Sequence, residues 1–486
     1  MRVAIIGGGV AGLAAAYELE KKRIQYTLFE AAPRLGGVIN SEIVGGAVLE
    51  LGPDSFLSEK PQAAELAREL GLGGELVGSN DEERKTFIVV KNRLIPLPDG
   101  LMFLIPTKLI PTMTTRLFSW GTKLRMGMEL LHPPRKTDGR DESVAELVRR
   151  HYGKEAVERL ADPLLSGIYG GDSSQLSAQT VLPKLVEMER EHGSLTRGML
   201  ASYAKMRKAM KARAVSAGPS AVGGGQAGKG AGAAPRTIFT TLKGGMSQLT
   251  SAIVAKLNPA NLRVRTPVAS VEPTGAGWIV RTGSAEAGPA AEQTFDAVIL
   301  ATPAWAAGKL LERVDAQLAA ELTAVTYSSS VTVNLVYDDE AALKLPEGFG
   351  FLVPASEGRS MLACTFVHRK FLGRTPEGKA VLRAFLGGMR GEALLAESDA
   401  HLIATVKREL KEILGIAAAP TAERVTRWSR SMAQYSVGHN ARKARIAERA
   451  AKLKGLYLAG NAYDGIGISD CIRLGKKAAG EIASSN

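Results

Sequence analysis

Three glycines close to the N-terminus have the spacing of a phosphate-binding turn. Gly7, Gly9 and Gly12 follow an apolar run at residues 3–6, and a helical pattern continues from residue 13 to residue 20. A second apolar run at residues 25–29 ends on Glu30. Such glycines let the backbone approach a pyrophosphate, and an acid at the end of the next strand accepts hydrogen bonds from ribose hydroxyls. The sequence therefore predicts a dinucleotide site, and Glu30 argues against a 2′-phosphate and so against NADP.

A second glycine pair follows this acid directly. Arg34 lies just before Gly36 and Gly37, so a cation and bare backbone would meet the same pyrophosphate. An NAD enzyme has no evident need for this second cradle. An ordinary basic turn is the alternative interpretation.

The C-terminal end of the chain repeats the pattern of the beginning. A short strand is expected at residues 455–460, and the glycine-rich turn at 461–470 precedes a helix expected at 471–483. The N-terminus of that helix would bring free N–H groups to a phosphate or to a cofactor ring. We therefore expect both ends of the chain to build one site, with a purely structural helix start as the alternative.

Length and composition indicate a soluble globular protein of ordinary type. A chain of 486 residues with 45% hydrophobic and 23% charged residues is expected to form two or three domains. Its two cysteines, Cys364 and Cys471, are far apart, which predicts neither a disulfide framework nor a metal site. The fold pattern begins at Arg2, so we expect no targeting peptide, and no apolar run is long enough to span a bilayer. These features favour a cytoplasmic location.

The net charge of +13 is concentrated in one part of the chain. Residues 192–271 contain no Asp or Glu but twelve Lys and Arg, so the remainder is nearly neutral. Such a block suits nucleic acid, anionic lipid or an acidic substrate. Only Tyr203 and Phe239 supply aromatic rings there, too few to stack bases, so we discount nucleic acid. A solvated basic face remains the alternative.

A second stretch combines apolar and basic residues. Residues 101–128 contain Trp120 and several cations but no acid, a composition typical of a surface that dips into a membrane interface. A helical subdomain with a buried apolar face is the alternative.

The motifs, taken in chain order, resemble the FAD-containing porphyrinogen oxidase family of the amine-oxidase superfamily. They are residues 7–12, 34–37, 51–56, 163–172, 242–246, 434–439 and 465–471. The resemblance implies that non-covalently bound FAD removes six electrons from protoporphyrinogen or coproporphyrinogen in haem biosynthesis and passes them to O₂. Amine oxidase, carotenoid desaturase and a non-catalytic binding protein on the same fold are the alternatives.

The resemblance also implies an α/β fold that is α+β in its substrate part, with a discontinuous Rossmann-like FAD domain, a mixed-sheet substrate domain and a helical, membrane-facing subdomain. We assign residues 1–56, 237–305 and 425–486 to the FAD domain and residues 57–91 and 306–424 to the substrate domain. Residues 92–213 form the helical domain, and the Gly/Ala-rich residues 214–236 are expected to be a flexible loop.

Matching the motifs residue by residue gives the expected binding positions. FAD contacts fall on Gly7, Gly8, Gly9, Val10, Ala11, Gly12, Glu30, Ala31, Arg34, Gly37, Val38, Gly52, Pro53, Asp54, Ser55, Val268, Trp428, Ile466, Gly467 and Ile468. Substrate positions fall on Gly170, Phe349, Thr365 and Phe385, where either phenylalanine could instead be plain core. No protein nucleophile or metal is implied, since the flavin performs the chemistry.

One position departs from the family pattern. An arginine that meets a substrate propionate in some members is replaced here by Thr86, with Arg84 and Lys85 beside it. Because protoporphyrinogen has two propionates and coproporphyrinogen four, these partners should decide the substrate. The sequence leaves the substrate open, and it leaves a monomer or a homodimer open as well.

Overall fold

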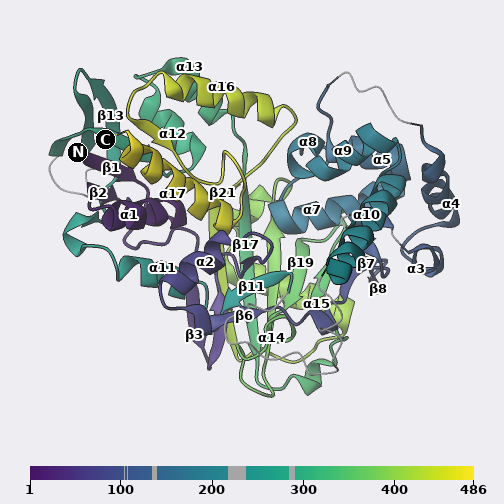
Figure 1. Cartoon of the computed structure of the whole chain (residues 1–486). Coiled ribbons are helices and arrows are strands. Elements are labelled where there is room, and N and C mark those ends of the chain that lie inside the picture. The colour runs from purple at the N-terminus through teal and green to yellow at the C-terminus, as the bar shows by residue number, and fades with distance from the viewer. Residues whose placement is uncertain (103, 107, 134–138, 217–236, 284–290, 486) are drawn as a thin grey trace.

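The computed structural model describes residues 1–102, 104–106, 108–133, 139–216, 237–283 and 291–485. Its secondary structure falls into three groups around three main hydrophobic cores (Figure 1). One group contains both chain termini, a second is built on a large mixed sheet, and the third is helical. This arrangement confirms the predicted α/β fold class.

The first group is a parallel sheet assembled from distant parts of the chain. Its strand order is β12-β2-β1-β16-β22, and every neighbouring pair is parallel. The strands are β1 (Arg2–Ile6), β2 (Gln25–Phe29), β12 (Leu262–Arg263), β16 (Ala297–Leu300) and β22 (Leu456–Leu458). Around it lie α1 (Val10–Lys21), α2 (Gln62–Glu69), α11 (Ser247–Val254), α12 (Ala304–Leu311), α13 (Ala316–Thr323), α16 (His439–Ala451) and α17 (Ile468–Ser484). Strands from both ends of the chain therefore belong to one sheet, as predicted.

Smaller antiparallel units accompany this sheet. Their strands are β3 (Ser41–Val44) with β4 (Ala47–Glu50), then β5 (Phe56–Leu57), β11 (Phe239–Leu242) and β6 (Leu76–Gly78), and finally β13 (Val268–Thr274), β14 (Gly277–Thr282) and β15 (Ala291–Phe295). Strands β15 and β16 are separated at Asp296, whose backbone N–H donates to the Arg2 carbonyl and whose carboxylate accepts from the Arg2 N–H. Strand β12 ends at Arg263, shortly before Arg265, which adopts a left-handed φ of 52°.

The second group is a mixed sheet with the order β21-β17-β20-β19-β18-β7-β8. The strands are β7 (Thr86–Val90), β8 (Arg93–Pro96), β17 (Tyr327–Tyr337), β18 (Gly350–Leu352), β19 (Met361–Phe366), β20 (Ala380–Gly387) and β21 (Ala422–Ala433). One face packs on α15 (Asp399–Leu414), and the short α14 (Val367–Lys370) follows β19. The assigned boundaries at residues 92 and 425 fall beside β8 and inside β21, so this sheet extends beyond both of them.

The third group is helical and packs around its own core. It contains α3 (Leu109–Thr114), α4 (Trp120–Met128), α5 (Val144–Tyr152), α6 (Lys154–Ala156), α7 (Asp162–Tyr169), α8 (Ala178–Val181), α9 (Pro183–His192) and α10 (Leu195–Ser216), with the short strands β9 (Leu101–Met102) and β10 (Ile105–Pro106). Between α6 and α7 the chain forms a π-helical turn, Val157–Ala161, just before Pro163, which has no N–H to donate.

Helix α10 begins at Leu195 and ends at Ser216. The Glu129 carboxylate accepts hydrogen bonds from the N–H groups of Leu195 and Thr196, which caps the helix from a distant segment. The helix also includes residues 214–216 of the expected flexible loop, and the rest of that loop lies outside the described residues. Within the described chain, no helix is both long and apolar enough to cross a bilayer.

Candidate active site

The N-terminal glycines have separate structural roles. Gly7 adopts a φ of 110°, and a Cβ there would lie 2.6 Å from the Ala301 carbonyl oxygen. A Cβ on Gly12 would lie 1.9 Å from the Gly7 carbonyl oxygen. Contacts within the protein therefore require glycine at both positions. A Cβ on Gly9 would meet no protein atom within 4 Å. Gly9 therefore keeps the backbone surface open where a ligand can approach.

The start of α1 presents hydrogen-bond donors at the same place. Gly9 is the N-cap and has no side chain to satisfy them, and the first bond of the helix runs from Leu13 N to Gly9 O at 2.9 Å. The N–H groups of Val10, Ala11 and Gly12 thus have no partner within the helix. Such an end suits the negative charge of a pyrophosphate.

The Arg34–Gly37 turn lies against this loop. Gly36 N donates to Gly8 O at 2.8 Å, and a Cβ on Gly37 would be 3.0 Å from Gly9 Cα. The Arg34 guanidinium donates to Gly37 O at 2.5 Å and Ile39 O at 3.0 Å, so it holds its own turn in shape. Its contact with a pyrophosphate stays a prediction. Val38, which follows the turn, is 39% exposed and available to a ligand.

Glu30 closes the opposite side of the loop. Its Oε2 accepts from Gly8 N at 2.6 Å and its Oε1 accepts from Ala32 N at 2.7 Å. The segment before Val268 contacts Glu30 as well, because Thr266 N donates to Glu30 O at 2.8 Å. Glu30, the exposed Ala31 and Val268 therefore gather at one end of the loop, where the adenosine of a dinucleotide would lie.

The segment Gly52 to Ser55 connects this loop with the mixed sheet. A Cβ on Gly52 would lie 1.7 Å from the Val38 carbonyl oxygen, so the two predicted contact segments touch. Trp428 in β21 donates from Nε1 to Leu51 O at 2.7 Å, and Arg383 in β20 donates to Gly52 O. The predicted cofactor positions 38, 52–55 and 428 are thereby brought together, although ligand contact itself stays a prediction.

Asp54 is held as a carboxylate in this segment. Lys370 Nζ lies 2.9 Å from its Oδ2, and Ser55 Oγ donates to its Oδ1 at 2.7 Å. Burial alone raises the pKa of Asp54, but the charges of Lys370 and Arg383 outweigh it and hold the pKa far below the usual range. A permanent negative charge therefore lies within residues 52–55, which we call the predicted flavin segment.

The C-terminal glycine turn completes the arrangement. Gly465 N donates to the Tyr435 hydroxyl at 2.8 Å, and Ile466 and Gly467 then lead into Ile468 at the start of α17. A Cβ on Gly475 would lie 2.1 Å from the Ala11 carbonyl oxygen, so α17 crosses α1 almost in backbone contact. Because α17 begins seven residues before that crossing, its N-terminus lies on the order of 10 Å from the start of α1. One helix start can thus meet a pyrophosphate while the other meets a flavin ring.

Buried polar groups at the junction fit a bound dinucleotide. Among the described residues, the Thr302 hydroxyl beside Gly7 and the Tyr463 hydroxyl have no hydrogen-bond partner although both are buried. Buried hydroxyls normally find a partner. Together with the open surface at Gly9, they indicate that the residues present suit a polar cofactor.

The predicted substrate positions lie in or beside the central strands β18, β19 and β20 of the mixed sheet. Thr365 in β19 pairs with Arg383 in β20, and Phe385 is two residues further along β20 on the same face. Phe349 precedes β18 and is 7% exposed. Gly170 follows α7 with a left-handed φ of 56°, and its carbonyl accepts from Met389 N at 2.9 Å just beyond β20. All four therefore belong to, or contact, neighbouring strands, while binding of substrate by them stays a prediction.

One cross-strand row connects Thr86, the position that departs from the family pattern, with the predicted substrate position Thr365. Thr86 pairs with Gly350, Gly350 with Thr365, and Thr365 with Arg383, so all four lie in one cross-strand row. Lys85, next to Thr86, forms an exposed ion pair with Glu347 at 2.9 Å. Among the described residues, Arg84 makes no ion pair. A free cation is therefore available at the end of the row.

Lys370 and Arg383 are functional candidates that the sequence patterns missed. Arg383 is a single charge in an otherwise apolar strand, and its guanidinium lies 4.6 Å from the centre of the Phe385 ring. A charge surrounded by apolar strand residues was the available signal, because such a group is rarely buried without a partner. Lys370 gave no comparable signal, since it follows two other basic residues.

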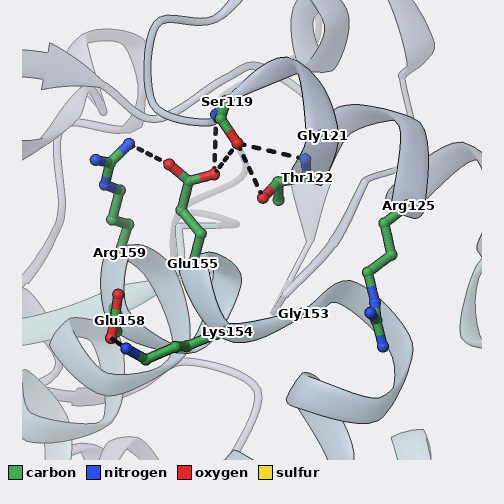
Figure 2. Close-up of a pocket in the computed structure, with 9 residues that line it drawn as sticks. All are labelled: Ser119, Gly121, Thr122, Arg125, Gly153, Lys154, Glu155, Glu158 and Arg159. Carbon is green, nitrogen blue, oxygen red and sulfur yellow. Dashed lines mark hydrogen bonds and ion pairs between the residues drawn. The ribbon is translucent and has the colours of Figure 1, made fainter.

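A cavity of about 510 Å³ lies elsewhere, between α4 and α6 of the helical group (Figure 2). Its polar groups are already paired: Glu155 accepts from Ser119 and binds Arg159, and Lys154 pairs with Glu158. We assign no chemistry to it. Across the described ranges, no group of three or more His, Cys, Asp or Glu side chains is placed to hold a metal ion.

Comparison with known proteins agrees with this geometry. The family model described as flavin containing amine oxidoreductase matches residues 10–483. The chain belongs to the flavin-containing amine oxidoreductase family. It is a FAD-dependent oxidoreductase, as the N-terminal glycine loop and the C-terminal glycine turn together predict.

Within this flavin-containing amine oxidoreductase family, the similar proteins include porphyrinogen oxidases. Coproporphyrinogen III oxidase of Bacillus subtilis is 35% identical over 483 residues, covering 98% of this chain and 96% of that protein. The enzyme of the same name from Staphylococcus aureus is 32% identical, covering 99% and 98%. The crystal structure of a putative protoporphyrinogen oxidase from Exiguobacterium sp. 255-15 superposes with a TM-score of 0.84 at 31% identity, over 100% and 99% of the two chains. The resemblance given by the sequence motifs is thus confirmed.

Proposed function

We propose that the protein oxidises coproporphyrinogen III to the porphyrin, with O₂ as electron acceptor. The observation that carries this proposal is the 35% identity to a coproporphyrinogen III oxidase along nearly the full length of both chains. That length includes the mixed sheet and the helical group as well as the cofactor loop. Protoporphyrinogen oxidase is the alternative within the same chemistry, since a mitochondrial protoporphyrinogen oxidase of Nicotiana tabacum is 29% identical.

The chain's own residues bind and orient the reactants. Bound FAD accepts two electrons at a time and passes them to O₂, so removal of six electrons takes three turnovers and forms three H₂O₂. Phe349 and Phe385 supply apolar surface for a flat macrocycle. Gly170 adds no side chain, so it lets the ring approach closely. Such a wall excludes water and holds a reacting carbon towards the flavin.

The carboxylates of the substrate need cations, and we propose Arg84 as one of them. It lies beside Thr86 at the end of the row that contains Thr365, and it is exposed. Lys85 is less available because its ammonium already pairs with Glu347. An additional cation favours the substrate with four propionates over the one with two.

Steady-state oxidation of the two porphyrinogens in parallel tests the proposal. The yellow holoenzyme should show a higher kcat/KM for coproporphyrinogen III, with O₂ consumed and H₂O₂ formed. Arg84→Gln should raise KM for coproporphyrinogen more than for protoporphyrinogen and leave kcat little changed. The exposed Arg93→Gln, on the next strand, is the matched control. Activity with amines alone, or with neither porphyrinogen, would disprove the assignment.

We also propose that the helical group binds an anionic membrane surface. Trp120, Leu124 and Met128 are 72%, 65% and 51% exposed at a spacing of four residues, so they form one apolar face of α4. Leu131 beyond this helix is 80% exposed. Exposed cations, Arg116 and Arg125, flank the face. An apolar stripe with flanking cations suits the interface of anionic lipids.

Other apolar residues of the stretch at 101–128 are core. Leu104, Ile105, Leu117 and Phe118 are at most 4% exposed and pack in the helical core, whereas Phe103 lies outside the described residues. Only part of the stretch is therefore available to lipid.

Flotation with liposomes tests the membrane proposal. The protein should float with vesicles containing phosphatidylglycerol at low salt and less with neutral vesicles. Trp120→Ser with Leu124→Ser should remove the binding, while Ile43→Ser, which changes an equally exposed residue on a distant hairpin, should not. Protein that stays at the bottom of the gradient with anionic vesicles at low salt would refute it.

A further inference from the structure

A buried cluster of charged side chains lies directly behind the predicted flavin segment. Its cations are Arg374, Arg383 and Lys370, whose side chains are 0%, 4% and 12% exposed. Its carboxylates are Glu50 and Asp54, at 1% and 16% exposure. These residues come from β4, the segment after it, α14, β20 and the loop before β20. The cluster thus joins the cofactor side of the site to the substrate sheet.

The charges of this cluster do not balance. Glu50 pairs with Arg374, and Asp54 pairs with Lys370 at 2.9 Å. Arg383 shares Asp54 only at 3.9 Å and donates to the neutral Gly52 carbonyl. Among the described residues, the five groups therefore carry one surplus positive charge. Protonation of Glu50 would only increase it.

An unbalanced buried charge is costly unless an anion completes it. The Nε–H groups of Arg383 and Arg374 are buried without a hydrogen-bond partner in the described chain, so the guanidinium groups retain unused donors. The Arg383 side chain also lies over Phe385 and holds Gly52, which places the surplus charge between the predicted flavin and substrate positions. A buried network with only a structural role would make the folded protein more stable if its net charge were zero.

Hydride transfer to a flavin creates such an anion. The substrate loses a hydride to the flavin and a proton to its surroundings, and the flavin gains one negative charge. We propose that the surplus charge of the Arg383–Lys370–Asp54 cluster stabilises the reduced flavin electrostatically, with Arg383 as the main contributor. This inference deepens the proposed function and rests on it, together with the predicted FAD contacts at Gly52 to Ser55.

The sign of the effect gives a sharp test. In purified holoenzyme, Arg383→Met should lower the flavin midpoint potential and weaken sulfite binding to the oxidised flavin on the order of tenfold, because one charge at several ångströms contributes this much in a protein interior. Asp54→Asn should act in the opposite direction by a similar factor. The double variant restores the net charge and should return both quantities close to the wild type. A tenfold change in the two-electron equilibrium corresponds to about 30 mV.

Controls separate this role from folding and from substrate binding. Arg359→Met removes a largely buried arginine, paired with Glu412, on the loop before β19 and should change neither quantity. If Arg383→Met does not retain FAD, Lys370→Met removes the same charge at a less buried position. Shifts of equal sign in the Arg383 and Asp54 variants would overturn the proposal. So would a raised KM for porphyrinogen with unchanged potential and sulfite affinity. Neither measurement uses porphyrinogen. Failure of this proposal can therefore be distinguished from failure of the proposed substrate assignment.

Discussion

Gly475 in α17 lies against Ala11 in α1, so close that a Cβ on Gly475 would be 2.1 Å from the Ala11 carbonyl oxygen. Both helices begin at glycine turns of the candidate site, and this contact sets the distance between the two helix starts. We expect Gly475→Ala to destabilise the protein by about 2 kcal/mol and to weaken FAD binding, because α17 must move away from α1. Thermal melting and FAD titration of the apoprotein would measure both effects.

The same helix offers the control. A Cβ on Gly480 would meet no atom within 4 Å, so Gly480→Ala should be neutral or stabilise the helix by up to about 1 kcal/mol. Destabilisation by both substitutions would show that the helix–helix contact is not the cause.

Gly9 and Gly12 should respond differently to the same substitution. Gly9→Ala places a methyl group in open space at an ordinary φ of −70°, so the apoprotein should melt like the wild type while FAD affinity falls at least about tenfold. Gly12→Ala forces a methyl group onto the Gly7 carbonyl and should destabilise the apoprotein itself. Unchanged FAD affinity in Gly9→Ala would argue against a pyrophosphate at this turn.

A buried histidine should make stability depend on pH. His151 lies between Glu129 at 2.9 Å and Glu189 at 3.3 Å, and all three side chains are at most 3% exposed. Burial lowers the pKa of His151, but the two carboxylates outweigh it and raise the pKa overall. Burial likewise raises the pKa of each glutamate, but hydrogen bonds with His151 and other donors bring both to about 2.

The signs of these shifts define the stable range. The depressed carboxylates contribute stability above their unfolded pKa of about 4.3 and lose it as pH falls towards about 2. The raised histidine contributes below its unfolded pKa of about 6.5 and loses this as pH rises through its folded pKa. The Tm should therefore be highest between these limits. His151→Gln should flatten the alkaline decline, whereas exposed His401→Gln should leave the profile unchanged.

Both cysteines should be inert in the native protein. Cys364 and Cys471 are 1% and 8% exposed, and burial raises the pKa of both thiols, that of Cys471 to about 12. A thiol of this kind reacts slowly, because the thiolate is the nucleophile. A disulfide reagent should label the holoenzyme only after denaturation. Removal of FAD should accelerate labelling of Cys471, near the start of α17, more than that of Cys364, and Cys471→Ser would identify the site.

FAD should be released by denaturation. Where covalent family members carry a flavin-linking cysteine, this chain has the turn at residues 459–462, and its nearest cysteine, Cys471, is buried in α17. We expect the yellow colour to pass through a filter that retains the denatured chain. Flavin that stays with the chain after acid precipitation would contradict this.

The parts of the site that sequence patterns predict are those built by local chain geometry. The turn at Gly7 to Gly12 and the acid at Glu30 belong to one strand–helix–strand unit, so their spacing alone predicts that they lie close together. The contact of Gly475 with Ala11 is invisible in the sequence, because a glycine within a helix has many explanations. The cap of α10 also escapes prediction, because it comes from Glu129 in another segment.

The charged groups behind Asp54 show a further limit of pattern analysis. Arg374, Lys370 and Arg383 lie more than 300 residues from Glu50 and Asp54 in the chain, and pairing between them depends on strand register in the mixed sheet. Hydrophobic periodicity predicts β20 itself but not which carboxylate its single arginine will meet.

Strand β22 occupies the edge of the parallel sheet beside β16, and α17 follows it to the end of the chain. During synthesis, the sheet that begins with β1 and β2 therefore cannot be completed until residues 456–458 have left the ribosome. The nascent protein consequently has no finished cofactor pocket until β22 and α17 have been synthesised. Loss of even the last thirty or so residues should leave an otherwise long product colourless and dependent on chaperones.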